Sequence, residues 1–257
     1  MTRLASLGCR ALCAPLSLLY ACTPAAPDRG PTSLERRVDD SGVNKALLFN
    51  GMDQYVTTAT AEFQDGLTPY ALSTWFRLDG LTGQQAFITV RKDLDSGLGF
   101  GVIDGALSAW RVSAVRTLVA APKAVTVDTW HHAAYVFDNA TNQLFLDGAL
   151  VASSTTVPDK RTPTSCWLGT RDGTSDLLHG SLDDVHVFKV ARTAEEIMSE
   201  FTGPLSTDTP DMVMNLTFDE TDGPIAYDHS SFENDGTLGD GIPERMPKRT
   251  SARKASN

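Results

Sequence analysis

The chain has 257 residues, of which 41% are hydrophobic and 21% are charged, and this is the composition of a globular protein with one main domain. Its formal net charge is −10 at pH 7. Because the segments outside residues 38–244 carry +8 in total, the core itself carries −18, which argues against nucleic-acid binding.

Residues 1–21 have the layout of an export signal. Two arginines, Arg3 and Arg10, precede an apolar run at 11–21. The run is too short for a transmembrane helix, which needs about 20 uninterrupted apolar residues. We therefore expect residues 1–21 to be a signal peptide that is absent from the mature protein.

The sequence Leu-Tyr-Ala-Cys at 19–22 resembles the bacterial lipobox. The resemblance implies cleavage before Cys22 and attachment of a lipid to its sulfur. It also implies a protein anchored at the bacterial envelope, with Thr23 after the cysteine favouring the outer membrane or cell surface. The alternative is an ordinary secretory signal, in which Cys22 is a plain cysteine without a lipid. Cys22 is the one membrane contact that the sequence predicts.

The segments that flank the core are predicted to lie outside the packed domain. Residues 22–37 are rich in Pro, Ala and charge without apolar periodicity, which is typical of a flexible tether. Residues 243–257 are basic and contain no apolar residue larger than Met246, so they predict a disordered tail. Cys166 is then the lone cysteine of the folded part, and we expect a small buried hydrophobic residue there.

Inside the core, short apolar or alternating runs are separated by Gly, Asp, Asn and Pro, which is the pattern of β-strands joined by turns. The runs predict strands near 45–50, 53–58, 70–78, 85–91, 98–103, 107–112, 123–127, 130–137, 143–147, 149–154, 165–170, 181–189 and 212–218. So many short strands at this spacing predict an all-β sandwich.

Adjacent histidines in "TWHHAAYVF", residues 129–137, raise the question of a metal site. Neighbouring side chains on a strand point to opposite faces, so His131 and His132 cannot bind one metal together. We expect His132 to be a hydrogen-bonded structural residue and His131 to be partly exposed. The strand continues into a meander through Asp147-Gly148, a strong hairpin signal between apolar runs.

Four segments resemble, in order, the laminin G-like domains of bacterial surface proteins. They are "KALLFNGMDQYVTT", "YALSTWFRL", "DTWHHAAYVFDNATNQLFLDGALVASS" and "CWLGTRDGTSDLLHGSLDDVHVFKVARTAEEI". The resemblance implies a jelly-roll β-sandwich of the concanavalin A-like lectin/glucanase type, with two antiparallel sheets. The residues add one short helix, in which Thr193 and Glu196 have the spacing of a capping box. Ile197 and Phe201 would dock this helix on the sandwich.

The segment 212–241 resembles the strand and D-x-S-x-x-N-x-G loop that usually precede "ALLFNG" in such domains. It either begins a second module or folds back into this one. A lone strand would leave its apolar side chains in water, so we expect 212–218 to pair near strand 45–50. The domain would then span 38–242, with Asp228, Asn234 and Asp235 in a loop at its rim.

Calcium is the cofactor that the resemblance allows. Concanavalin A-like folds often place a structural-calcium Asp on the strand that matches "SLDDVHVF", which implies Asp183 as a ligand. Its partners would be oxygens of Asn50, Gly51 and Asp53, because calcium prefers carboxylate and carbonyl oxygens. The alternative is that Asp183 and Asp184 are solvated or capping carboxylates.

Catalysis is not expected. Glycoside hydrolases need two carboxylates across the scissile bond, and the Glu-x-Asp-x-Glu pattern usual in this superfamily does not occur. The G-x-S-x-G, H-E-x-x-H and P-loop patterns do not occur either.

We therefore expect a non-catalytic binding or adhesion module at the cell surface that recognises a glycan or a protein. The alternatives are a structural spacer or assembly protein of the envelope and a divergent glycoside hydrolase. Trp110 and Tyr70 are possible sugar-stacking residues, although an aromatic residue in a sandwich is more often part of the core.

Overall fold

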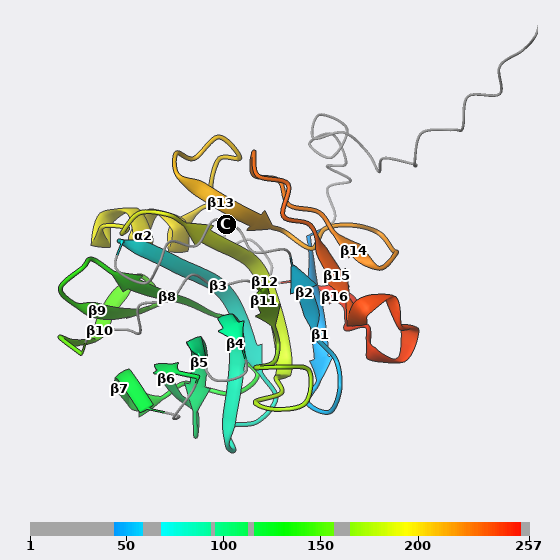
Figure 1. Cartoon of the computed structure of the whole chain (residues 1–257), viewed down its shortest axis with the longest axis horizontal. Coiled ribbons are helices and arrows are strands. Elements are labelled where there is room, and N and C mark those ends of the chain that lie inside the picture. Colours follow the sequence, from blue (N-terminus) through cyan, green and yellow to red (C-terminus); the bar gives the residue numbers. More distant parts are fainter. Residues whose placement is uncertain (1–43, 59–67, 94–95, 113–115, 157–164, 253–257) are drawn as a thin grey trace, which may run out of the picture.

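The computed structural model describes residues 44–58, 68–93, 96–112, 116–156 and 165–252 (Figure 1). The predicted signal peptide, Cys22 and the tether lie outside these residues. Two antiparallel sheets of eight strands each and one short helix confirm the predicted all-β jelly-roll sandwich.

The first sheet, called sheet A, has a central strand, β12, with partners on both sides. Its strands in spatial order are β10 (Ala149–Ser154), β9 (Asn142–Leu146), β8 (His131–Phe137), β3 (Tyr70–Leu78), β12 (His179–Phe188), β1 (Lys45–Asn50) and β16 (Lys248–Ser251), with β13 (Met212–Leu216) also paired to β12.

The second sheet, called sheet B, contains the middle of the sequence together with two short strands from its C-terminal part. Its order is β14 (Ile225–Ala226), β15 (Gly236–Leu238), β2 (Val56–Thr58), β11 (Ser165–Leu168), β4 (Gln84–Asp93), β5 (Ser96–Ile103), β6 (Ala106–Arg111) and β7 (Arg116–Ala124). β7 begins earlier than the predicted strand 123–127, and β14 and β15 were not predicted.

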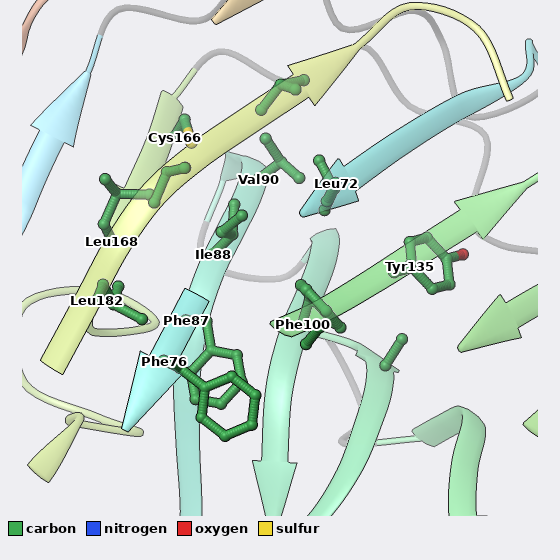
Figure 2. Packing of buried hydrophobic residues seen from close by; sticks show 14 of the residues in the cluster. Leu72, Phe76, Phe87, Ile88, Val90, Phe100, Tyr135, Cys166, Leu168 and Leu182 are labelled. Carbon is green, nitrogen blue, oxygen red and sulfur yellow. The ribbon is translucent and has the colours of Figure 1, made fainter. Parts of the chain in front are cut away.

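The main core lies between the two sheets, because alternate side chains of each strand point inward. Phe76 from sheet A stacks on Phe87 from sheet B, with ring centroids 4.4 Å apart (Figure 2). Cys166 and Leu168 enter the same core from β11. The predicted buried character of Cys166 is confirmed, and burial raises the pKa of its thiol to about 12, so the thiolate that would react is not formed at neutral pH.

Helix α2 (Ala194–Thr202) covers part of the outer face of sheet A over a second, smaller apolar cluster. The predicted capping box is present, since the Thr193 side chain accepts from the Glu196 backbone and the Glu196 side chain accepts from the Thr193 backbone. Ile197 is fully buried, and Phe201 stacks on Trp75. None of the helices in the described part of the chain is both long and apolar enough to cross a membrane.

The predicted hairpin between β9 and β10 has positive φ at both Asp147 and Gly148, as its tight turn requires. The Asp147 carboxylate binds the ring of His131 at 2.8 Å and accepts from the backbone N–H of His132 at 2.9 Å. The ring of His132 is fully buried, and its Nε2 lies 3.5 Å from a carboxylate oxygen of Glu200, at the long end of hydrogen-bond distance. His132 is thus a buried structural residue whose polar contact is long, whereas the His131 ring makes short hydrogen bonds to Thr126 and Asp147.

The C-terminal segment folds back onto the sandwich, beside β1 and β2 (Figure 1). β13 pairs with one half of β12, from Val185 to Phe188, and β1 pairs with the other half. β13 therefore follows β1 along the same side of β12 rather than pairing with β1 itself.

The D-x-S-x-x-N-x-G loop is held by one buried carboxylate. Asp228 accepts from the backbone N–H groups of Asn215, Ser230 and Asn234, and from the Ser230 hydroxyl. Asn234 donates back to the carbonyl of Val213. This motif therefore fastens the loop to β13.

The prediction of a disordered basic tail from residue 243 is wrong for residues 243–252. A 3-10 turn at Pro243–Arg245 leads into β16, which pairs with β1. The reason is that Arg249 is not solvated: its guanidinium donates to the carbonyls of Phe218 and Ile225 and to the Glu220 carboxylate. Arg249, which the sequence placed in a solvated tail, therefore connects β16 to the segment that contains Phe218, Glu220 and Ile225.

Candidate functional site

The outer face of sheet B carries a partly exposed aromatic residue in the middle of the sheet. On β11, Cys166 and Leu168 point into the core, so the side chain of Trp167 between them points outward. On β2, Val56 points into the core and Thr57 points outward in the same way. Trp167 remains partly exposed.

Strand register aligns Trp167 with a row of residues on the neighbouring strands. Trp167 pairs with Thr57 on β2 and with Thr89 on β4. Paired side chains lie side by side on one face of a sheet. The complete row, called the Trp167 row, is Thr237, Thr57, Trp167, Thr89, Gly99, Trp110 and Thr117.

The Trp167 ring is positioned from three sides. Its indole N–H donates to the Ser165 hydroxyl at 3.2 Å. The ring of Tyr55 lies 5.3 Å away between centroids, and the guanidinium carbon of Arg91 lies 5.8 Å from the ring centroid, within cation–π range. Arg91 is itself fixed by a hydrogen bond from Nη1 to the carbonyl of Arg171. Trp167 is therefore a rigid platform, so little side-chain freedom would be lost on binding.

A carboxylate lies beside this platform. Asp240 is exposed, and its two oxygens accept from the hydroxyls of Tyr55 at 2.8 Å and Thr57 at 2.9 Å. Burial, followed by the hydrogen bond to Asp240, raises the pKa of Tyr55 above its ordinary value, so its hydroxyl stays protonated and donating at neutral pH. The site thus combines an aromatic surface with polar groups of both charges, which is the usual composition of a small-ligand site.

The two aromatic residues that the sequence suggested for stacking on a sugar are both buried. Trp110 is fully buried, with its ring against Gly99, and Tyr70 lies in the core with its hydroxyl 3.4 Å from that of Tyr135. Burial raises the pKa of Tyr70. Trp167 was not among the predicted site residues, although the alternation of side chains on a strand points it outward between the buried Cys166 and Leu168.

The four residues predicted as calcium ligands do not meet in one place. Asn50, Gly51 and Asp53 share a turn, where Asn50 donates to the Asp53 carboxylate at 2.9 Å. Asn50 pairs with His179, so Asp183 lies four positions further along β12, roughly 13 Å away at the usual rise per strand residue. The buried Asp183 carboxylate accepts from the backbone N–H of Asp184. The strand register therefore places Asp183 too far from Asn50, Gly51 and Asp53 for all four residues to bind one calcium ion.

Metal binding has no other candidate in the described ranges, where no group of three or more His, Cys, Asp or Glu residues could hold an ion. Whether the protein binds calcium elsewhere is not tested by the structure, so a structural calcium stays a prediction.

A buried polar cluster lies between α2 and sheet A. Glu200, 3% exposed, accepts from the Ser73 hydroxyl, and the same oxygen lies 2.7 Å from His186 Nδ1 and 3.5 Å from His132 Nε2. The group contains Ser, His and Glu, but the carboxylate receives both the serine and the histidine. A catalytic triad instead needs the serine bonded to the histidine, so the arrangement is structural.

The charges in this cluster stabilise each other. Burial by itself raises the pKa of Glu200, but His132 and His186 outweigh it and lower that pKa far below its ordinary value. Burial by itself lowers the pKa of His186, but the hydrogen bond and charge of Glu200 outweigh it and raise that pKa. Glu200 and His186 therefore form a buried ion pair that fixes α2 to sheet A.

The fold and register place this chain in the class of concanavalin A-like jelly-roll sandwiches. Residues 50–198, more than half of the chain, match the family Laminin_G_3, described as the concanavalin A-like lectin/glucanases superfamily. The chain belongs to this laminin G family. No curated protein matches the chain.

Solved structures share the fold at low sequence identity. A protein from Bacteroides ovatus with a suggested carbohydrate-binding role is 14% identical, with a TM-score of 0.61 over 81% of this chain and 60% of its own. Domain 4 of an extracellular arabinanase from Geobacillus stearothermophilus, in complex with arabinotriose, is 21% identical, with a TM-score of 0.50 over 60% and 75%.

A heptameric SAP-like pentraxin from Limulus polyphemus is 12% identical, with a TM-score of 0.53 over 79% of this chain and 97% of its own. This chain thus spans less than two thirds of the Bacteroides protein but nearly all of the pentraxin. At such identities the likeness shows the fold alone.

Proposed function

We propose that the chain is a non-catalytic glycan-binding module and that its binding surface is the outer face of sheet B around Trp167. The observation that carries the proposal is a partly exposed tryptophan at the centre of a sheet, framed by Arg91, Tyr55 and Asp240. An aromatic face packs against the apolar C–H groups of a sugar, and the surrounding polar groups bind its hydroxyls. The carbohydrate-binding descriptions of structural neighbours agree with this proposal.

Replacement of Trp167 by alanine tests the proposed surface. We expect Trp167→Ala to weaken glycan binding at least about tenfold, as is common for an aromatic contact at the centre of an interface. The measurement is a glycan array followed by titration calorimetry with the bound glycans. Trp130→Ala is the matched control, because Trp130 is also partly exposed but precedes β8 in sheet A. Equal glycan binding by Trp167→Ala and the wild type, with both folded, would remove this face as the site.

We further propose that the module is held at the bacterial envelope by a lipid on Cys22, as the motif at 19–22 suggests. We expect the wild type to incorporate labelled palmitate in a bacterial host and to partition into detergent. Cys22→Ser should be unlabelled and released from the membrane fraction, whereas Cys13→Ser, in the predicted signal peptide, should remain labelled. A wild type that never takes up palmitate would rule the anchor out.

A further inference from the structure

Arg91 is a nearly buried cation in the proposed site. It is 7% exposed, and its guanidinium donates a hydrogen bond to the carbonyl of Arg171. Across the described part of the chain, no carboxylate forms an ion pair with it. A guanidinium carries five N–H donors, so most of its donors have no acceptor among the described residues.

The described residues compensate the charge of Arg91 only in part. A buried charge normally needs a partner of opposite sign, and a cation–π contact with one ring offsets only part of the loss of hydration. The neighbouring Arg171 differs, because Asp172 lies 3.3 Å and Asp176 lies 3.9 Å from its Nε. Two carboxylates neutralise Arg171, whereas no carboxylate in the described ranges neutralises Arg91.

The nearby carboxylates are also engaged elsewhere. Asp172 accepts from Thr174 and Ser175 as well as Arg171, and Asp240 accepts from Tyr55 and Thr57. Among the described residues, the positive charge of Arg91 therefore has no carboxylate partner beside the partly exposed Trp167 ring, although the chain as a whole carries −10. Because the net charge of the protein repels anions, an anionic ligand would have to be attracted by the nearby charge of Arg91 itself.

We propose that the ligand is an anionic saccharide whose carboxylate or sulfate group pairs with Arg91 while its sugar ring contacts the exposed part of Trp167. This inference rests on the glycan-binding function proposed above and names its ligand class. The planar guanidinium suits a planar carboxylate through two parallel hydrogen bonds, and such charged bonds are stronger than neutral ones. Arg91 is then the residue that selects acidic over neutral sugars.

The test is calorimetry with the full chain and two pairs of probes. One pair is an oligogalacturonate and its methyl-esterified neutral form, and the other is a sulfated galactan oligosaccharide and its desulfated form. We expect at least one acidic probe to bind about tenfold more tightly than its neutral partner, a difference of about 1.4 kcal/mol. The pair that shows the preference distinguishes a carboxylate from a sulfate ligand.

Variants at the cation then test its role. Arg91→Gln should reduce the ratio of acidic to neutral affinity to about one, whereas Arg171→Gln, the matched control, should keep the preference. Arg91→Lys retains the charge but loses the paired geometry, so it should retain only part of the preference. If Arg91→Gln fails to fold, Arg91→Lys takes its place in the test. An acidic preference in Arg91→Lys as large as in the wild type would then contradict the proposal.

The outcomes separate the two proposals. Binding of neutral probes at least as tight as acidic ones, lost in Trp167→Ala, would overturn the anionic ligand and leave the glycan site standing. An acidic preference that persists in Arg91→Gln would overturn the role of Arg91. Failure of the wild type to bind any glycan, on the array or in these titrations, would overturn both.

Discussion

Deletion of residues 212–257 is expected to unfold the sandwich. The deletion removes one strand beside β12, another beside β1 and two from the edge of sheet B. It also removes the buried side chains of Val213, Leu216, Phe218 and Leu238. Truncating a single large core side chain costs about 2–5 kcal/mol, and a whole domain is stable by about 5–15 kcal/mol. The loss therefore exceeds the stability of the fold.

The measurement is urea unfolding followed by far-UV circular dichroism, together with gel filtration. A graded variant keeps the comparison quantitative if the deletion yields no soluble protein. Arg249→Ala leaves the Glu220 carboxylate without its cation and two carbonyls without donors, and should cost about 3 kcal/mol or more. Lys248→Ala, at an exposed position of the same strand, should change stability by less than about 0.5 kcal/mol. A truncated protein as stable and monomeric as the full chain would contradict the completed-sandwich structure.

Replacement of the buried Glu200 is expected to have the next largest effect. Glu200→Gln removes the charge that faces His132 and His186 while keeping the size of the side chain, and should cost about 3–5 kcal/mol near pH 6. Glu195→Gln is the control, because Glu195 is exposed on the same helix. Urea unfolding measures both.

The effect should depend on pH with a defined sign. His186 has a raised pKa, so its contribution is complete below its unfolded value of 6.5 and is lost as the pH rises through the folded value. Glu200 has a lowered pKa, so its contribution is present above its unfolded value of 4.5 and is lost only in strong acid. Asp184 and Asn215 also face His186 and act in the same direction as Glu200.

The stability difference between wild type and Glu200→Gln should therefore be largest between about pH 5 and 6 and should decrease above neutral pH. A difference that stays constant from pH 5 to 9 would mean that His186 is not charged in the native protein. A Gln variant as stable as the Glu195→Gln control at pH 6 would show that the buried ion pair contributes nothing.

Features with local causes were predictable from the sequence. The capping box at Thr193 and Glu196 and the turn at Asp147 and Gly148 each depend on residues a few positions apart, and both formed as predicted. The sandwich itself followed from the spacing of apolar runs.

Features that depend on distant pairing were not predictable in the same way. Arg249 looks like any basic tail residue until the carbonyls of Phe218 and Ile225 are brought to it. The four predicted calcium ligands do not meet, because the register between β1 and β12 decides which residues are close together, and this register cannot be read from the order of the motifs in the sequence. The Trp167 row joins seven strands and is visible only once their register is known.

The pairing of β1 with β16 has a consequence for how the chain acquires its fold. Lys45 is aligned with Ser251, so the first and the last described strands are neighbours in space. A growing chain cannot form this contact until residue 251 has been synthesised, and closing such long loops slows folding. Until then the edge of β1 stays open to pairing with other chains. We therefore expect slow refolding that aggregates at high protein concentration, with the last strand closing the structure.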